Sequence, residues 1–244
     1  MQAATRYLQL VRAQLEQAAQ QQEAIGAAAG LVARAIGGGG LWHLFGTGHS
    51  HLLAEEMFYR AGGLAAVNPI LEEGLMLHRG AAQSTALERL AGLADVVLDQ
   101  QPTSPGDALL IVSNSGRNAV PIEMALAARR KGIAVISLSS LQSAAVVTSR
   151  HASGRLLHEL ADVALDNMTV PGDAALDIDG VAQRVCATST VTGAALLQAV
   201  AAAAIEQLAA AGGAPAVFAS SNGDAGDAHN RALIQRYKGA VRCL

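Results

Sequence analysis

The sequence of 244 residues contains little charge, few aromatic side chains and almost no cysteine. Charged residues make up 15% of the chain and aromatic residues 3%, whereas hydrophobic residues make up 51%. The two cysteines, Cys186 and Cys243, lack the spacing of a metal-binding motif and are too few for a disulfide scaffold. The chain is long enough for one large buried domain and too apolar for a disordered protein.

The absence of other features limits the classes of partner and the cellular compartment that we expect. The net charge of −3 provides no basic patch, so we expect no nucleic-acid partner. The apolar residues 191–211 come closest to a membrane span, but Gln198, Glu206 and Gln207 interrupt them. Arg6 lies among the first apolar residues, which argues against a signal peptide. We therefore expect a cytoplasmic protein that does not insert into a membrane.

A glycine-rich stretch follows the first apolar run. Residues 41–45 are almost all apolar and predict a strand, and a helical pattern follows Ser50. Between them stand Gly46, Gly48, His49 and Ser50, a set suited to an anion because glycine lets a ligand approach the backbone closely. A tight turn without a ligand is the alternative.

Two better-known glycine loops are excluded here. A dinucleotide fingerprint needs a third glycine, and His51 occupies that position. A P-loop needs a lysine after the glycines, and none follows. The stretch therefore suits a small phosphate monoester better than a dinucleotide or a triphosphate.

A second loop of the same kind follows the strand predicted at residues 108–112. It holds Ser113, Asn114, Ser115, Arg117 and Asn118, and a helix is predicted to follow it up to residue 131. Serine and asparagine also favour ordinary turns and helix caps. Two such loops together nevertheless favour a shared phosphate site, in which hydroxyl and N–H groups donate hydrogen bonds to the anion.

The remaining pattern alternates strands and helices. A seam of apolar residues predicts a long N-terminal helix over residues 5–36. The other predicted elements are strands at 64–70, 133–138 and 161–165, helices at 84–93, 179–211 and 230–236, and a turn-like tail at 222–229. Such alternation predicts an α/β fold with a parallel sheet covered on both faces, and ligands bind at the carboxyl ends of its strands. Ser139 follows one of these strands, and Ser189 lies among three consecutive hydroxyl residues that could face the ligand.

The sequence resembles the SIS (sugar isomerase) domain family. The resemblance rests on Gly46-x-Gly48-x-Ser50 and Ser113-x-Ser115-Gly116, and covers about residues 30–212. With residues 149–154, these motifs are similar to those of the small single-domain, phosphoheptose-isomerase-like and phosphosugar-binding members. The resemblance implies a three-layer αβα sandwich with a five-stranded parallel sheet of flavodoxin-like type, a sugar-phosphate ligand, and a homodimer or homotetramer. We expect residues 1–36 to form a packing helix and residues 37–244 the SIS domain.

Acid–base chemistry needs further residues. In SIS-fold isomerases a Glu and a His after the second strand line the sugar site, so the resemblance implies catalytic roles for Glu72 or Glu73 and for His78. His151 and His229 are further proton-transfer candidates. For each of these residues, a solvated surface position is the alternative.

The helix after the first loop departs from the heptose-phosphate isomerases of this family. The offsets that hold their His and Glu fall here on Glu56 and Arg60, while His51 and Glu55 form a similar pair one turn earlier. A surface contact is the commoner outcome for such a pair. We therefore expect no metal and no other cofactor, with zinc as the less favoured alternative.

The leading functional interpretation is an aldose–ketose isomerase that acts on a sugar phosphate through a general base and an enediolate. A non-catalytic phosphosugar sensor and a lyase acting on a sugar-acid phosphate are the alternatives. The family motifs indicate the ligand class but do not select among these reactions.

Overall fold

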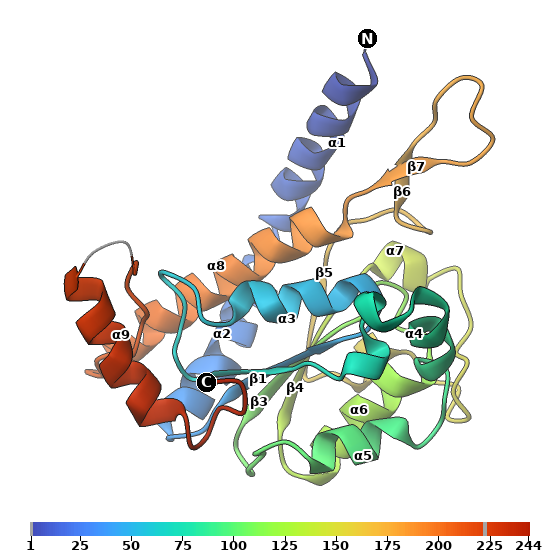
Figure 1. Ribbon diagram of the computed structural model, residues 1–244. Helices are drawn as coiled ribbons and strands as arrows, with labels where there is room; N and C mark the ends of the chain where they lie inside the picture. Colours follow the sequence, from blue (N-terminus) through green and yellow to red (C-terminus); the bar gives the residue numbers. More distant parts are fainter. Residues whose placement is uncertain (1, 222–223) are drawn as a thin grey trace.

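The computed structural model describes residues 2–221 and 224–244 as a three-layer αβα sandwich (Figure 1). Its five parallel strands have the order β2-β1-β3-β4-β5. The strands are β1 (Trp42–Gly46), β2 (Val67–Ile70), β3 (Ala108–Val112), β4 (Ala134–Ser139) and β5 (Val163–Asp166). This order confirms the predicted flavodoxin-like sheet, and it places the point where the strand order reverses between β1 and β3.

Two apolar clusters cover the two faces of the sheet. On one face, Leu44 and Leu110 pack with helices α2 (Gln22–Gly37), α3 (His51–Met57) and α8 (Ser189–Ala210). On the other, Phe45 and Ile111 pack with α5 (Leu93–Asp99) and α6 (Ala119–Arg130). Successive strand residues point to opposite faces, so each central strand contributes apolar side chains to both clusters.

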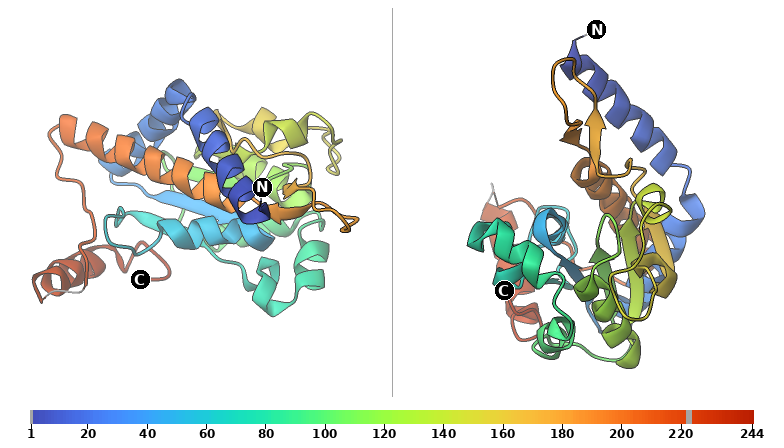
Figure 2. Two further views of the ribbon diagram at one scale, coloured as in Figure 1. Left: turned by 90° about the horizontal axis from the view of Figure 1, so that it is seen from above. Right: turned by 90° about the vertical axis from the view of Figure 1, so that its right-hand side faces the viewer.

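The remaining elements lie between or after those of the sandwich. They are the 3-10 turns η1 (Gly48–Ser50), η2 (Glu73–Leu75), η3 (Leu77–Arg79) and η4 (Leu157–Leu160), the helices α4 (Ala81–Leu87), α7 (Leu141–Ala144) and α9 (Asp224–Tyr237), and the antiparallel pair β6 (Ala174–Leu176) and β7 (Val185–Ala187). Figures 1 and 2 show α9 at the end of the sheet opposite α4 and α7.

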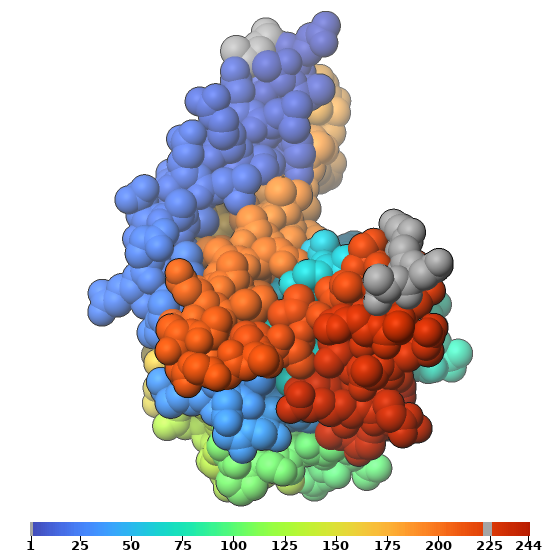
Figure 3. All heavy atoms as spheres, turned by 90° about the vertical axis from the view of Figure 1, so that its left-hand side faces the viewer, coloured from blue at the N-terminus to red at the C-terminus, as the bar shows by residue number. Residues whose placement is uncertain are grey.

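The long N-terminal helix is present, but it is divided into α1 (Ala3–Ala18) and α2. Helix α2 packs into the core, whereas α1 stands out from the body of the domain beside the β6–β7 hairpin (Figures 1 and 3). Tyr7 and Arg6 of α1 donate hydrogen bonds to the carbonyl oxygens of Ala187 and Asp177. Leu8 remains 67% exposed, so part of the apolar seam has no cover within one chain.

Helix α8 is, among the described residues, the one helix long and apolar enough to cross a membrane by length and composition alone. Inside the domain, its residues Leu197, Val200 and Ala204 are buried in the cluster that also contains α2. Its apolar length is therefore used in packing against the sheet and against α2.

Three predicted elements are wrong. The helix predicted at 84–93 is replaced by α4 and α5, which are separated at Gly92, where φ is +85°. The helix predicted at 179–211 begins only at Ser189, because the β6–β7 hairpin precedes it. The tail predicted as a turn at 222–229 is helical from Asp224, while Asn222 and Gly223 lie outside the described residues.

Candidate functional site

The first loop joins β1 to α3 through η1. Gly46 is required here by close packing, because a Cβ atom would lie 2.5 Å from the carbonyl carbon and oxygen of Ser50. Gly48 has a φ of +56°, which favours glycine. Ser50 directly precedes α3, and its hydroxyl caps no backbone group. The glycines thus turn the chain sharply and leave a half-buried hydroxyl at the carboxyl end of β1.

The second loop joins β3 to the 12-residue helix α6. Gly116 has a φ of +61°, and its N–H donates to Ser113 Oγ at 3.3 Å, which closes the turn. Asn118 lies at the N-terminus of α6 and uses its side-chain oxygen to accept a hydrogen bond from Arg150. Ser115 is half-buried, and its hydroxyl has no hydrogen-bond partner among the described residues. Ser115 and Asn118, at the N-terminus of α6, line the same cleft.

Both loops line one open cleft of about 450 Å³, at the carboxyl ends of β1 and β3. This volume is in the range of small-molecule sites. Eight of the eleven predicted binding residues line the cleft: Gly48, His49, Ser50, Ser113, Asn114, Ser115, Arg117 and Asn118. The structure therefore brings most of the predicted phosphosugar-binding set together.

The remaining predicted binding residues lie beside or beneath the cleft. Gly46 shapes the turn below Ser50 without lining the cleft. Ser139 is buried at 1% exposure, with its hydroxyl unpaired among the described residues. Ser189 shares a narrow neighbouring pocket with His49 and Ser50, but its hydroxyl donates to Asp173 at 2.5 Å. These contacts give Ser189 a role at the start of α8.

The predicted acid–base residues after β2 face solvent. Glu72, Glu73 and His78 are exposed, and Glu73 forms an ion pair with Arg79 at 3.4 Å. Leu77 of the same loop lies next to Gly48. The loop is therefore beside the first serine loop, but in the described residues its acids do not line the cleft.

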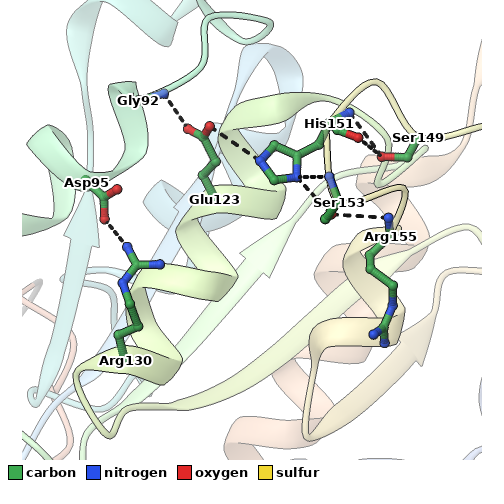
Figure 4. A network of polar contacts seen from close by, with 8 residues as sticks. All are labelled: Gly92, Asp95, Glu123, Arg130, Ser149, His151, Ser153 and Arg155. Atoms are coloured by element: carbon green, nitrogen blue, oxygen red, sulfur yellow. Dashed lines mark hydrogen bonds and ion pairs between the residues drawn. The ribbon is translucent and has the colours of Figure 1, made fainter.

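The two other histidines predicted to transfer protons, His151 and His229, make contacts outside the cleft. His151 lies 3.6 Å from Glu123 of α6 and 2.8 Å from the Ser153 hydroxyl, within the polar network that Figure 4 shows. His229 belongs to α9, and its Nε2 lies 2.8 Å from the Val217 carbonyl oxygen at the opposite end of the sheet. One chain therefore does not bring His229 to the two loops.

The His51–Glu55 pair is a helix contact. Its nearest atoms are 3.8 Å apart, and His51 Nδ1 also contacts the Gly48 carbonyl oxygen. Among the described residues, no group of three or more His, Cys, Asp or Glu side chains is arranged to hold a metal ion.

The structure adds lining residues that the sequence interpretation missed. The most important are Glu88, a carboxylate at the end of α4, and Arg150. Thr47 and Ser143 add polar groups, and Val146 and Val147 add apolar surface. Glu88 lies 25 residues before Ser113 and Arg150 lies 32 residues after Asn118, so the sequence of the two loops does not indicate that these residues line the cleft.

Comparisons with known proteins agree with this geometry. A family model described as SIS domain matches residues 6–140. A UPF0309 protein of Listeria monocytogenes serotype 4b (strain CLIP80459) is 48% identical over 213 residues, which cover 87% of this chain and 86% of that protein.

Solved structures with the same fold are more distant in sequence. A phosphoheptose isomerase from Francisella tularensis is 15% identical with a TM-score of 0.56, and the match covers 84% of this chain and 100% of that chain. The Vibrio vulnificus NanR protein complexed with ManNAc-6P is 16% identical with a TM-score of 0.51, and the match covers 100% of this chain and 70% of that chain. At these identities the likeness concerns the fold.

Proposed function

We propose that this chain, which belongs to the SIS domain family as its two serine loops predicted, binds a sugar phosphate. The sugar phosphate binds in the cleft that the two loops line. The carrying observation is that Ser50 and Ser115 line one cleft with hydroxyls that have no hydrogen-bond partner among the described residues. Both hydroxyls are thus available to a phosphate dianion. Backbone N–H groups and the helix dipole at the start of α6 favour the same charge.

The reaction that we propose is aldose–ketose isomerisation. A base removes a proton from the carbon next to the carbonyl, and hydroxyl and N–H donors stabilise the resulting enediolate. Glu72 or Glu73, with His78, remain the candidates implied by the family resemblance. Glu88 is supported by its position, because it is the carboxylate that lines the cleft among the described residues. The phosphoheptose isomerase with the same fold supports this reaction class by analogy.

A non-catalytic phosphosugar sensor is the second candidate. It is favoured by the exposure of Glu72, Glu73 and His78, which leaves a binding cleft with one lining carboxylate. The NanR protein, which carries ManNAc-6P, is a ligand-bound neighbour of the same fold. Enzyme and sensor differ in whether the bound sugar exchanges a carbon-bound proton.

The test incubates the protein with a panel of aldose and ketose phosphates in deuterated water and follows the ligands by NMR and mass spectrometry. An isomerase gives a product of the same carbon skeleton that carries solvent deuterium at carbon, and the Ser115→Ala variant loses this activity. A sensor binds a phosphate without exchange, and a lyase yields fragments. Binding without exchange for every sugar phosphate of the panel would refute the isomerase assignment.

A further inference from the structure

The segment that carries Arg150 is tied to the second serine loop by three hydrogen bonds. Arg150 donates from its backbone N–H to the Arg117 carbonyl oxygen at 2.8 Å, and from Nη1 to Asn118 Oδ1 at 2.9 Å. Arg117 donates from Nε to the Thr148 carbonyl oxygen at 3.0 Å. Both arginines line the cleft.

The positive charges of Arg117 and Arg150 are not fully balanced by carboxylates of the cleft. Glu88 is the one carboxylate lining the cleft among the described residues, against Arg117 and Arg150, and Arg89 adds a further positive charge nearby. None of the three arginines forms an ion pair with a described carboxylate, whereas Arg129, Arg130 and other basic residues do.

The neighbouring positive charges act on Arg150. Desolvation and the charges of Arg117 and Arg89 lower the pKa of Arg150, and Glu88 acts in the opposite direction. Like charges held together raise the electrostatic energy of the empty cleft, and an anion between them would lower it.

The two lining arginines keep the donors that suit an oxyanion. Arg117 uses Nε for Thr148 and leaves both terminal nitrogens free, and Arg150 uses Nη1 and leaves Nη2 and Nε. A pair of parallel N–H groups on one guanidinium matches the two oxygens of a carboxylate or a phosphate. One phosphate dianion is already provided for by Ser50, Ser115 and the start of α6.

We propose that the sugar phosphate bound here carries a second anionic group, a carboxylate or a second phosphate, and that Arg117 and Arg150 bind it. The inference rests on the proposed phosphosugar site and narrows its ligand to doubly anionic sugars. In the free protein, Arg117 and Arg150 are held in place by Thr148 and Asn118, so the second site is formed before the ligand arrives.

The test uses calorimetry with three probes: glucose 6-phosphate, 6-phosphogluconate and fructose 1,6-bisphosphate. Wild type should bind at least one doubly anionic probe about tenfold or more tightly than glucose 6-phosphate, since each bond to a charged partner contributes substantially. Preference for 6-phosphogluconate identifies a carboxylate site, and preference for fructose 1,6-bisphosphate a second phosphate site.

Arg150→Gln should reduce that preference to about twofold or less and leave the affinity for glucose 6-phosphate nearly unchanged. Arg117→Gln tests the second guanidinium independently, and circular dichroism checks that each variant is folded. The matched control is Arg130→Gln, which removes the same charge from α6 at its ion pair with Asp95 and should preserve the preference.

Two results would overturn the proposal. In one, wild type binds the three probes equally. In the other, the arginine variants weaken the binding of glucose 6-phosphate as much as the binding of the doubly anionic probes. That result would assign the arginines to the first phosphate. Failure of the phosphosugar function itself looks different: no probe binds, or Ser115→Ala leaves every affinity unchanged.

Discussion

Asp107→Asn should destabilise the folded chain, because this carboxylate joins three groups at the start of β3. Its Oδ1 accepts the Leu41 N–H at 2.9 Å, and its Oδ2 accepts the Ser104 N–H at 2.7 Å. Oδ2 also lies 3.0 Å from His43 Nε2, and Asp107 is only 2% exposed. Asparagine keeps one acceptor oxygen and places an NH₂ group against N–H donors on the other side.

The neighbouring bonds define the histidine tautomer. Arg242 N–H donates to Asn68 Oδ1 at 3.1 Å, so the Asn68 amide nitrogen is the atom that lies 3.1 Å from His43 Nδ1. An amide nitrogen only donates, so Nδ1 accepts, and Nε2 carries the proton that is donated to Asp107. The network thus runs from the C-terminal segment through β2 and β1 to β3.

The size of the destabilisation by Asp107→Asn follows from the hydrogen bonds that the variant loses. The variant loses one or two buried hydrogen bonds to a charged group, each about 1.5–3 kcal/mol, so we expect a loss of about 2–5 kcal/mol in the free energy of unfolding. For a chain of this length, that loss lowers the thermal midpoint by about 5–15 °C.

The effect should depend on pH. Burial opposes ionisation of Asp107, but hydrogen bonds from His43, Leu41 and Ser104 outweigh it and lower the pKa of Asp107. Because the folded-state pKa lies below that of the unfolded chain, ionised Asp107 stabilises the fold above the unfolded pKa, and this contribution is lost as pH falls through the folded pKa. The difference between wild type and Asp107→Asn should therefore be full at pH about 7 and shrink below pH about 4.

Urea unfolding followed by circular dichroism, at neutral and at acid pH, measures both effects. The matched control is Asp99→Asn, which removes an exposed ion pair with Lys131 and should cost less than about 1 kcal/mol. Equal stabilities of the two variants at neutral pH would refute the structural role of the buried network.

Three further predictions concern the site and the assembly. Gly46→Ala should displace the backbone at Ser50 and abolish detectable sugar-phosphate binding in calorimetry; retained wild-type affinity would mean that the turn tolerates a Cβ atom. If the protein is an isomerase, replacing the base by glutamine should lower turnover by about 10²–10⁴-fold while binding survives, and assays of Glu72→Gln, Glu73→Gln and Glu88→Gln identify which carboxylate acts; full activity in all three would place the base elsewhere. The exposed Leu8 of α1 predicts a homodimer or homotetramer that Leu8→Lys weakens, and a wild-type monomer at high micromolar concentration in light scattering would contradict this.

The parts of the fold that local pattern determines were predictable from the sequence. The apolar run before Gly46 and the run before Ser113 are both buried strands, and each ends in the loop expected of it. The N-terminal helix was predicted as continuous, and a three-residue break at 19–21 divides it. The division into residues 1–36 and 37–244 stays a prediction.

The predicted elements that failed depend on contacts between distant segments. Helix α8 begins at Ser189 because the Asp173 carboxylate accepts the N–H groups of Thr188 and Ser189 at 3.1 and 3.0 Å. Helix α5 begins after Gly92, whose N–H donates to Glu123 of α6 at 2.8 Å. Neither contact leaves a periodic signal in the sequence around the helix.

The residues of the site also fall into those that local sequence predicted and those that depend on distant contacts. Ser50 and Ser115 were found because each closes a strand–turn–helix unit within a few residues. Glu88 and Arg150 reach the cleft through contacts between distant segments. The Val120 N–H donates to the Glu88 carbonyl oxygen, and the backbone N–H of Arg150 donates to the Arg117 carbonyl oxygen. Local spacing therefore identified the phosphate loops and Arg117, but not Glu88 and Arg150, as residues of the cleft.

The most direct measurement of the central claim compares sugars with their phosphates by calorimetry. We predict that the wild-type protein binds a sugar phosphate and binds the unphosphorylated sugar poorly. Ser50→Ala and Ser115→Ala should each weaken binding of the phosphate by about tenfold or more while the thermal midpoint stays near that of wild type. Equal affinity for a sugar and its phosphate, or full affinity in both alanine variants, would contradict the phosphosugar site.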